Sequence, residues 1–128
     1  MHKGFLITAA LLGAISVALG AFGAHALKET LSEQSLVTYE TAVRYQFYHV
    51  FALALTGILR GYFPGGRIRF AGILFIAGII VFSGSLYLLV ALPEMRWLGA
   101  ITPLGGLCFI AGWVMLALGI ANTGASKQ

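Results

Sequence analysis

The sequence predicts an all-α protein: a bundle of four transmembrane helices with both termini on the cytoplasmic side. Of the 128 residues, 59% are hydrophobic and only 9% are charged, whereas soluble domains carry about 25% charged residues. The apolar residues gather into four stretches, each close to the roughly 20 residues that cross a bilayer core. The basic residues between these stretches are unevenly divided between the two sides. At this length we expect one domain, residues 1–128.

The first stretch, residues 5–27, has no charged side chain apart from His25, which can take up a proton. Lys3 before it and Ala24-His25-Ala26 near its end resemble the start and the cleavage site of a secretory signal. The apolar part of such a signal is about 7–15 residues long, so this stretch is too long. Three more apolar stretches follow it. We therefore interpret residues 5–27 as a membrane span.

The second stretch, residues 40–59, begins with polar and ionisable side chains and ends as an unbroken apolar run. The letters TLSE at residues 30–33 match the capping box, a pattern that starts a helix. We therefore expect this helix to begin outside the bilayer, with Thr30 as its N-cap. Ionisable groups are costly in lipid, so a span that carries them is a candidate functional segment.

The third and fourth stretches are residues 70–92 and 98–121, and neither contains a charged side chain. Trp97 lies just before the fourth stretch and suits the membrane interface. Pro103 is expected in the first turn of the fourth helix, where a missing N–H group is tolerated. We find no internal repeat, so the sequence gives no support to an inverted-repeat transporter.

The charges predict the orientation of the four spans. The side that holds both termini and the middle loop carries five basic residues and no acid, whereas the other side carries three basic residues and four acids. Loops rich in Lys and Arg stay in the cytoplasm, so we expect cytoplasmic termini and, in a bacterium, a location in the inner membrane. The basic residues are scattered at segment ends, which argues against a nucleic-acid partner.

Small residues form stripes on two of the predicted helices. Lipid provides no hydrophobic drive for helix association, so small residues are needed for close packing. The stripes predict tight contacts within the bundle or between the subunits of a homo-oligomer, and the sequence does not choose between these. The packing residues that we predict are Gly13, Ser16, Gly20 and Gly23 on the first helix and Gly105, Gly112 and Gly119 on the fourth.

Uncharged polar side chains concentrate in the outer half of the predicted bundle. They form either a hydrogen-bonded network that sets helix register or a small polar cavity, open to the outside, that binds a ligand or passes protons. On the second helix Gln46 and His49 are three residues apart and share a face. The candidate cavity residues are His25, Tyr45, Gln46, His49, Ser83, Ser85, Tyr87 and Thr102.

Metal and nucleophile chemistry are weaker alternatives for these residues. His25 and His49 could share a metal, but nothing completes a usual set of four ligands, so we expect no metal and no cofactor. Ser83 or Ser85 could act as a nucleophile with His49, yet no acid is evidently placed to orient the histidine. The two serines differ by about 200° around a helix, so they face different partners. We therefore name no catalytic residue and do not favour an enzyme.

Short motifs lie in all four spans: GAFGAH at 20–25, YQFYH at 45–49, FSGSLY at 82–87, TPLGG at 102–106 and AGW at 111–113. Together they resemble one family of small membrane proteins of unknown function, which includes the bacterial YgdD- and YwdK-like proteins and a eukaryotic transmembrane counterpart. The resemblance implies a four-helix integral membrane protein, found in the inner membrane of bacteria, and implies no activity.

We expect a non-enzymatic membrane component that binds a small molecule, a lipid or a partner protein through its outward-facing polar cluster. One alternative is a small transporter or channel subunit, although the inner halves of the spans offer few polar residues to line a path. The other is a structural or assembly protein whose polar cluster only sets helix packing.

Overall fold

The computed structural model describes residues 1–125, with side chains described as far as Asn122, and within this part it contains helices and no strand. This confirms the all-α prediction. The elements are α1 (Lys3–Phe22), the π-helical turn η1 (Gly23–Leu27), α2 (Glu33–Leu59), α3 (Gly66–Gly78), the π-helical turn η2 (Ile79–Ser83), α4 (Gly84–Ala91) and α5 (Leu98–Ala125).

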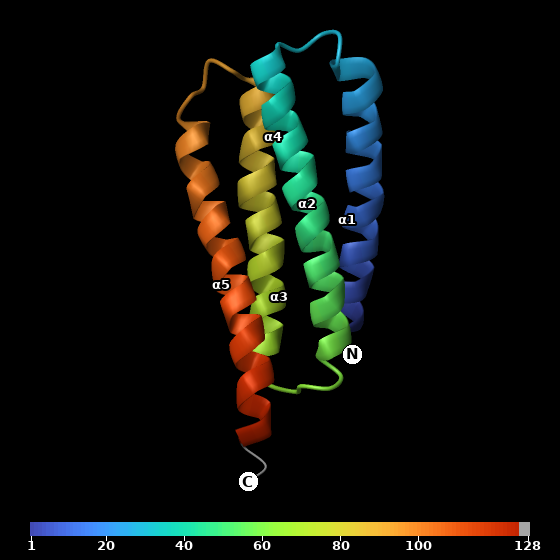
Figure 1. Cartoon of the computed structure of the whole chain (residues 1–128), viewed down its shortest axis with the longest axis vertical. Coiled ribbons are helices and arrows are strands. Elements are labelled where there is room, and N and C mark those ends of the chain that lie inside the picture. Colours follow the sequence, from blue (N-terminus) through green and yellow to red (C-terminus); the bar gives the residue numbers. More distant parts are fainter. Residues whose placement is uncertain (126–128) are drawn as a thin grey trace.

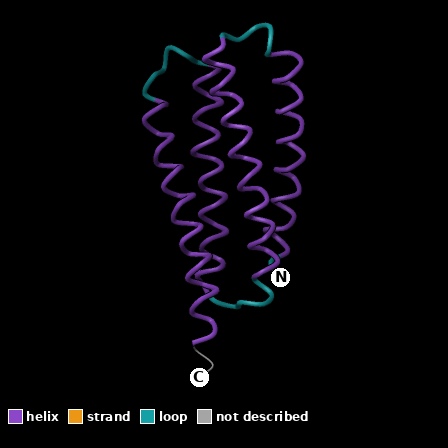
Figure 2. Tube along the Cα trace, viewed as in Figure 1, coloured by secondary structure: helices purple, strands orange, loops and turns teal. Residues whose placement is uncertain are grey.

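These elements form four long rods, because η1 continues α1 and η2 joins α3 to α4 without a break. The rods run alternately up and down, and the N-terminus and the end of α5 lie at the same end of the molecule (Figure 1). The connecting loops lie only at the two ends (Figure 2). Each loop is short, so rods that are adjacent in sequence run antiparallel to each other.

Three of the four rods are long and apolar enough to cross a membrane: Lys3–Leu27, Gly66–Ala91 and Leu98–Asn122. The fourth rod, α2, is also long, at 27 residues. It is less apolar than the others because it carries Arg44, Gln46 and His49 among its polar side chains.

Two helix details differ from the sequence predictions. Helix α2 begins at Glu33, and its N-cap is Ser32, whose hydroxyl accepts a hydrogen bond from the Ser35 N–H at 3.1 Å. Thr30 is therefore not the N-cap, and the capping-box prediction was wrong by two residues. Pro103 lies inside α5 rather than in its first turn, because the helix begins at Leu98.

The core is made of buried side chains from all four rods. Leu53, Ile68 and Phe75 are fully buried there. Helix α5 packs mainly against α3, and α1 packs mainly against α2. As a result, α2 and α5 flank the rod formed by α3, η2 and α4.

The glycine stripe of α5 lies against the α3–η2 rod. A Cβ atom added at Gly105 would lie 2.4 Å from the backbone nitrogen of Phe82. One added at Gly112 would lie 2.7 Å from the Phe75 ring, and one at Gly119 would lie 2.6 Å from Ile68. These contacts are within one chain, and side chains at these positions would force the two rods apart.

The small residues of α1 face α2 more loosely. Added Cβ atoms at Gly13 and Gly20 would meet only valine methyl groups at 3.6 Å, an ordinary contact distance. Ser16 is buried and donates to the Leu12 carbonyl at 2.8 Å. Gly23 is the tight position, because a Cβ there would lie 2.4 Å from the ring of Tyr39.

Candidate functional site

His49 has partners on both ring nitrogens. It projects from α2 and is 5% exposed. Its Nδ1 lies 2.8 Å from the Tyr45 carbonyl oxygen, which can only accept, so Nδ1 carries the proton. Its Nε2 then accepts a hydrogen bond from Trp113 Nε1 of α5 at 3.2 Å. His49 is therefore a neutral imidazole that links α2 to α5.

Aromatic rings enclose this imidazole. The Phe109 ring stacks on it with centroids 3.5 Å apart and planes 8° apart. Tyr45 is roughly parallel to it at 6.2 Å, and Phe75 lies 5.8 Å away. Aromatic neighbours at these separations both fill space and orient the ring. The rings come from α2, α3 and α5, so the packing of three rods sets the position of His49.

An open groove of about 500 Å³ lies beside His49, between α2 and α5. Tyr45 and Trp113 remain 38% and 44% exposed at the groove, so it opens sideways from the bundle. Most of its wall is aromatic or apolar, and its polar groups come from α2 apart from the Trp113 N–H, which is bonded to His49. The residues that line it are Thr41, Tyr45, His49, Phe82, Gly106, Phe109, Ile110 and Trp113.

Gln46 belongs to a different contact although it shares a helix face with His49. It is 3% exposed. Its Oε1 accepts from the Tyr87 hydroxyl of α4 at 2.7 Å, and its Nε2 donates to the Leu12 carbonyl of α1 at 3.4 Å. One amide thus joins α1, α2 and α4. The prediction that Gln46 and His49 line one cavity does not match this arrangement, because they contact different helices.

The serines of the η2–α4 junction also face inward. Ser83 donates to the Ala42 carbonyl of α2 at 2.8 Å. The Ser85 hydroxyl lies 2.6 Å from the Thr102 hydroxyl of α5. The two serines thus face different helices, as their spacing predicted. Neither hydroxyl bonds His49, whose ring nitrogens are engaged by Tyr45 and Trp113, so the Ser-His arrangement is not assembled.

His25 stands apart from the other candidate residues. It lies in η1 and is exposed, whereas His49 is buried against α5. In the described residues no three His, Cys, Asp or Glu side chains come close enough to hold a metal ion. Every buried polar side-chain atom in this same part of the chain has a hydrogen-bond partner.

Comparison with known proteins places the chain in a family. The model of a family described as "Protein of unknown function (DUF423)" matches residues 19–106. The UPF0382 membrane protein SH2409 of Staphylococcus haemolyticus is 48% identical over 91% of this chain and 93% of its own length. The UPF0382 membrane protein YwdK of Bacillus subtilis is 42% identical over 91% and 94%. This chain belongs to the DUF423 family.

Membership confirms the resemblance predicted from the motifs, and it makes this DUF423 chain a membrane protein, as its bacterial relatives are named. No solved structure matches it. Two of the family-like motifs coincide with the π-helical turns: GAFGAH runs into η1, and FSGSLY begins in η2. Such turns interrupt an α-helix at a cost and are frequent at functional sites.

Sequence reasoning missed two side chains of the DUF423 chain that hold its helices together. Trp113 was noticed only within a motif, yet an indole N–H inside a span needs an acceptor, and His49 was the obvious one to seek. Tyr39 lies directly before the second apolar stretch, and sequence reasoning assigned it no role. Its hydroxyl donates to the Leu19 carbonyl of α1, and its ring covers Gly23.

Proposed function

We propose that this protein crosses the cytoplasmic membrane four times, with both termini in the cytoplasm, and holds one lipid-like amphiphile in the groove between α2 and α5. The single observation that carries the binding proposal is this groove of about 500 Å³, which has aromatic walls and opens sideways from the bundle. A lateral opening within a bilayer faces lipid, so its natural occupant is a molecule already dissolved there.

Chain length supports α2 as the fourth span. Five residues join η1 to α2 and six join α2 to α3, and extended chain reaches at most about 3.6 Å per residue. Neither loop can cross a core of about 30 Å. If the rods on both sides of α2 cross the membrane, α2 must cross as well, and its 27 residues reach about 40 Å.

The internal hydrogen bonds support an apolar occupant over a polar one. Gln46, Ser83, Ser85 and Tyr87 bond within the bundle, so they have no need of a ligand. The polar side chains that line the groove are Thr41, Tyr45 and His49. Thr41 donates to the Val37 carbonyl, and both ring nitrogens of His49 are engaged, so the Tyr45 hydroxyl is the group left to contact a ligand. This lining suits an acyl or isoprenoid chain carrying a single polar group, since pockets of this size use few polar contacts to orient a ligand.

Two glycines of α5 provide a matched test. A Cβ at Gly106 would meet Phe82 only at 4.0 Å, and a Cβ at Gly99 would meet nothing within 4 Å. Only Gly106 lines the groove. We expect Gly106→Leu to fill the groove and Gly99→Leu to leave it open, with both proteins folded.

The measurement is native mass spectrometry of the protein extracted from membranes in a mild detergent. The wild type and Gly99→Leu should each carry one lipid-mass adduct more than Gly106→Leu. The same number of adducts on all three proteins, or none on the wild type, would refute binding in this groove.

A further inference from the structure

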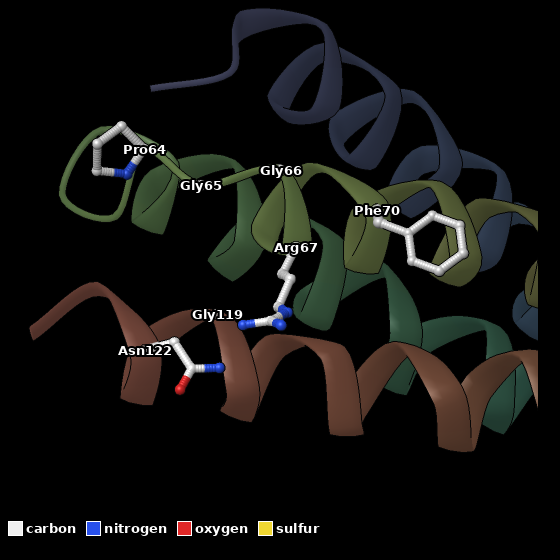
Figure 3. Close-up of a pocket in the computed structure, with 7 residues that line it drawn as sticks. All are labelled: Pro64, Gly65, Gly66, Arg67, Phe70, Gly119 and Asn122. Atoms are coloured by element: carbon white, nitrogen blue, oxygen red, sulfur yellow. The ribbon is translucent and has the colours of Figure 1, made fainter. Parts of the chain in front are cut away.

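A second pocket, of about 600 Å³, lies at the opposite end of the bundle from the acidic residues, between the start of α3 and the end of α5. Arg67 extends from α3 towards α5, and Asn122 lies one turn beyond Gly119 on α5 (Figure 3). Phe70 lines the same pocket further along α3. The pocket therefore combines a cation and an amide at its outer end with an aromatic ring towards the middle of the bundle.

The α3 and α5 backbones approach closely at the floor of this pocket. A Cβ at Gly119 would lie 3.2 Å from the Ile68 backbone nitrogen. The mouth is open by contrast, because a Cβ at Gly65 or Gly66 would meet nothing within 4 Å. An elongated molecule could enter at the mouth and lie along the seam between the two helices.

Among the described residues, the charged side chains at this end of the bundle are basic. Arg67 is exposed, and the described residues that line the pocket include no acidic side chain. The acids of the chain are elsewhere: Glu29 lies between η1 and α2, Glu33 and Glu40 lie in the first eight residues of α2, and Glu94 lies between α4 and α5. These elements meet at the end of the bundle opposite the pocket (Figure 1). An anion at Arg67 would therefore meet attraction without local competition from the acidic side chains of the described residues.

We propose that this pocket binds the phosphate headgroup of an anionic phospholipid, with Arg67 and Asn122 contacting the phosphate and an acyl chain passing over Phe70. The first N–H groups of α3 add donors, because the start of a helix leaves them without internal partners and carries partial positive charge. Basic pockets between membrane helices on the cytoplasmic side suit anionic headgroups. The site is separate from the groove between α2 and α5.

Arg69 provides the matched control for Arg67. It is two residues away, is also exposed, and does not line the pocket. Changing either arginine to glutamine removes one positive charge from the same end of the molecule. Both side chains are exposed, so neither variant should impair folding. A difference between the two variants therefore reports the pocket rather than general surface charge.

The experiment titrates phosphatidylglycerol into the delipidated full-length protein and follows the complex by native mass spectrometry. We expect one tightly bound phosphatidylglycerol, about fivefold weaker binding in Arg67→Gln, and binding close to wild type in Arg69→Gln. The same binding should persist in Gly106→Leu, which keeps this test independent of the groove.

Three results would overturn the proposal. Equal weakening by both arginine variants would show that general surface charge, and not the pocket, attracts the lipid. Phosphatidylcholine with identical acyl chains binding as tightly would remove the role of headgroup charge. Displacement of phosphatidylglycerol by millimolar inorganic phosphate would make free phosphate, and not a lipid, the ligand.

Discussion

At the scale of single residues, the polar side chains inside the bundle form pairs between helices, and each pair specifies which two helices are in contact. His49 bonds Trp113 across α2 and α5, Gln46 bonds Tyr87 across α2 and α4, and Ser85 lies against Thr102. In lipid an unpaired polar group costs several kcal/mol because no water replaces the lost partner. A rotated or displaced helix would leave such groups unpaired, so these pairs favour one arrangement.

The His49–Trp113 pair allows a direct test of this coupling. We expect His49→Phe and Trp113→Phe each to lower the free energy of unfolding. The loss in the double variant should be smaller than the sum of the two single losses, and the difference should be about 0.6 kcal/mol and at most about 1.7 kcal/mol. Unfolding in mixed detergent micelles gives the free energy of unfolding of the wild type, the two single variants and the double variant. His49→Phe combined with Trp97→Phe is the control and should be additive, because Trp97 is 58% exposed and lies before α5. Additivity in the first cycle would contradict the hydrogen bond.

At the scale of elements, the seam between α5 and the α3–η2 rod depends on the π-helical turn. The turn η2 ends at Ser83, and the backbone of Phe82 within it is the closest neighbour of Gly105. A π-helical turn widens the helix locally, and a glycine opposite it allows the α5 backbone to approach. The same junction directs Ser83 to α2 and Ser85 to α5.

The adjacent glycines Gly105 and Gly106 allow the cost of overpacking a close helix contact to be measured apart from the effect of helix propensity. We expect Gly105→Ala to destabilise the protein by about 1–3 kcal/mol, because the new methyl group would overpack the seam. A Cβ there would lie 2.4 Å from the Phe82 backbone nitrogen, and backbone cannot move aside as a flexible side chain does. Gly106→Ala meets its nearest neighbour only at 4.0 Å and should be neutral or stabilising.

Both variants are unfolded thermally in the same detergent, and size-exclusion chromatography of the remaining folded protein gives the midpoint of unfolding of each. Equal midpoints for Gly105→Ala and Gly106→Ala would show that the two helices do not meet at Gly105 as described.

At the scale of the whole molecule, charge is separated along the bundle. The four acids lie in the half of the bundle with the η1–α2 and α4–α5 connections. Four basic residues lie at the other end: Lys3 at the start of α1, Arg60 after α2, and Arg67 and Arg69 in the first turn of α3. A bundle with this separation favours one orientation, because basic loops are retained in the cytoplasm. The proposed headgroup pocket at Arg67 would then face the cytoplasmic leaflet, which is rich in anionic lipid.

Single cysteines in the three loops test both the number of spans and the orientation. In a Cys108→Ser background, a membrane-impermeant maleimide should label Glu29→Cys and Glu94→Cys in intact cells, and Tyr62→Cys only after the membrane is opened. All three positions are exposed, so burial does not prevent labelling. The reverse pattern would invert the orientation, and labelling of Glu29→Cys and Tyr62→Cys from one side would mean that α2 does not cross.

The sequence by itself determined the class of the protein, its helical rods and its family. Long apolar stretches and few charges leave the backbone no option in lipid except helices, and motifs in all four rods indicated the family. Helical spacing also identified faces, such as the period-seven stripe of Gly105, Gly112 and Gly119.

Only the tertiary structure decided which face meets which helix. It separated Gln46 from His49, left His25 outside, supplied Trp113 as the partner of His49, and opened the groove beside them. The physical reason is that periodicity is a property of one helix. Rotation, π-helical turns and close glycine contacts depend on the mutual fit of all four rods, to which residues far apart in sequence contribute together.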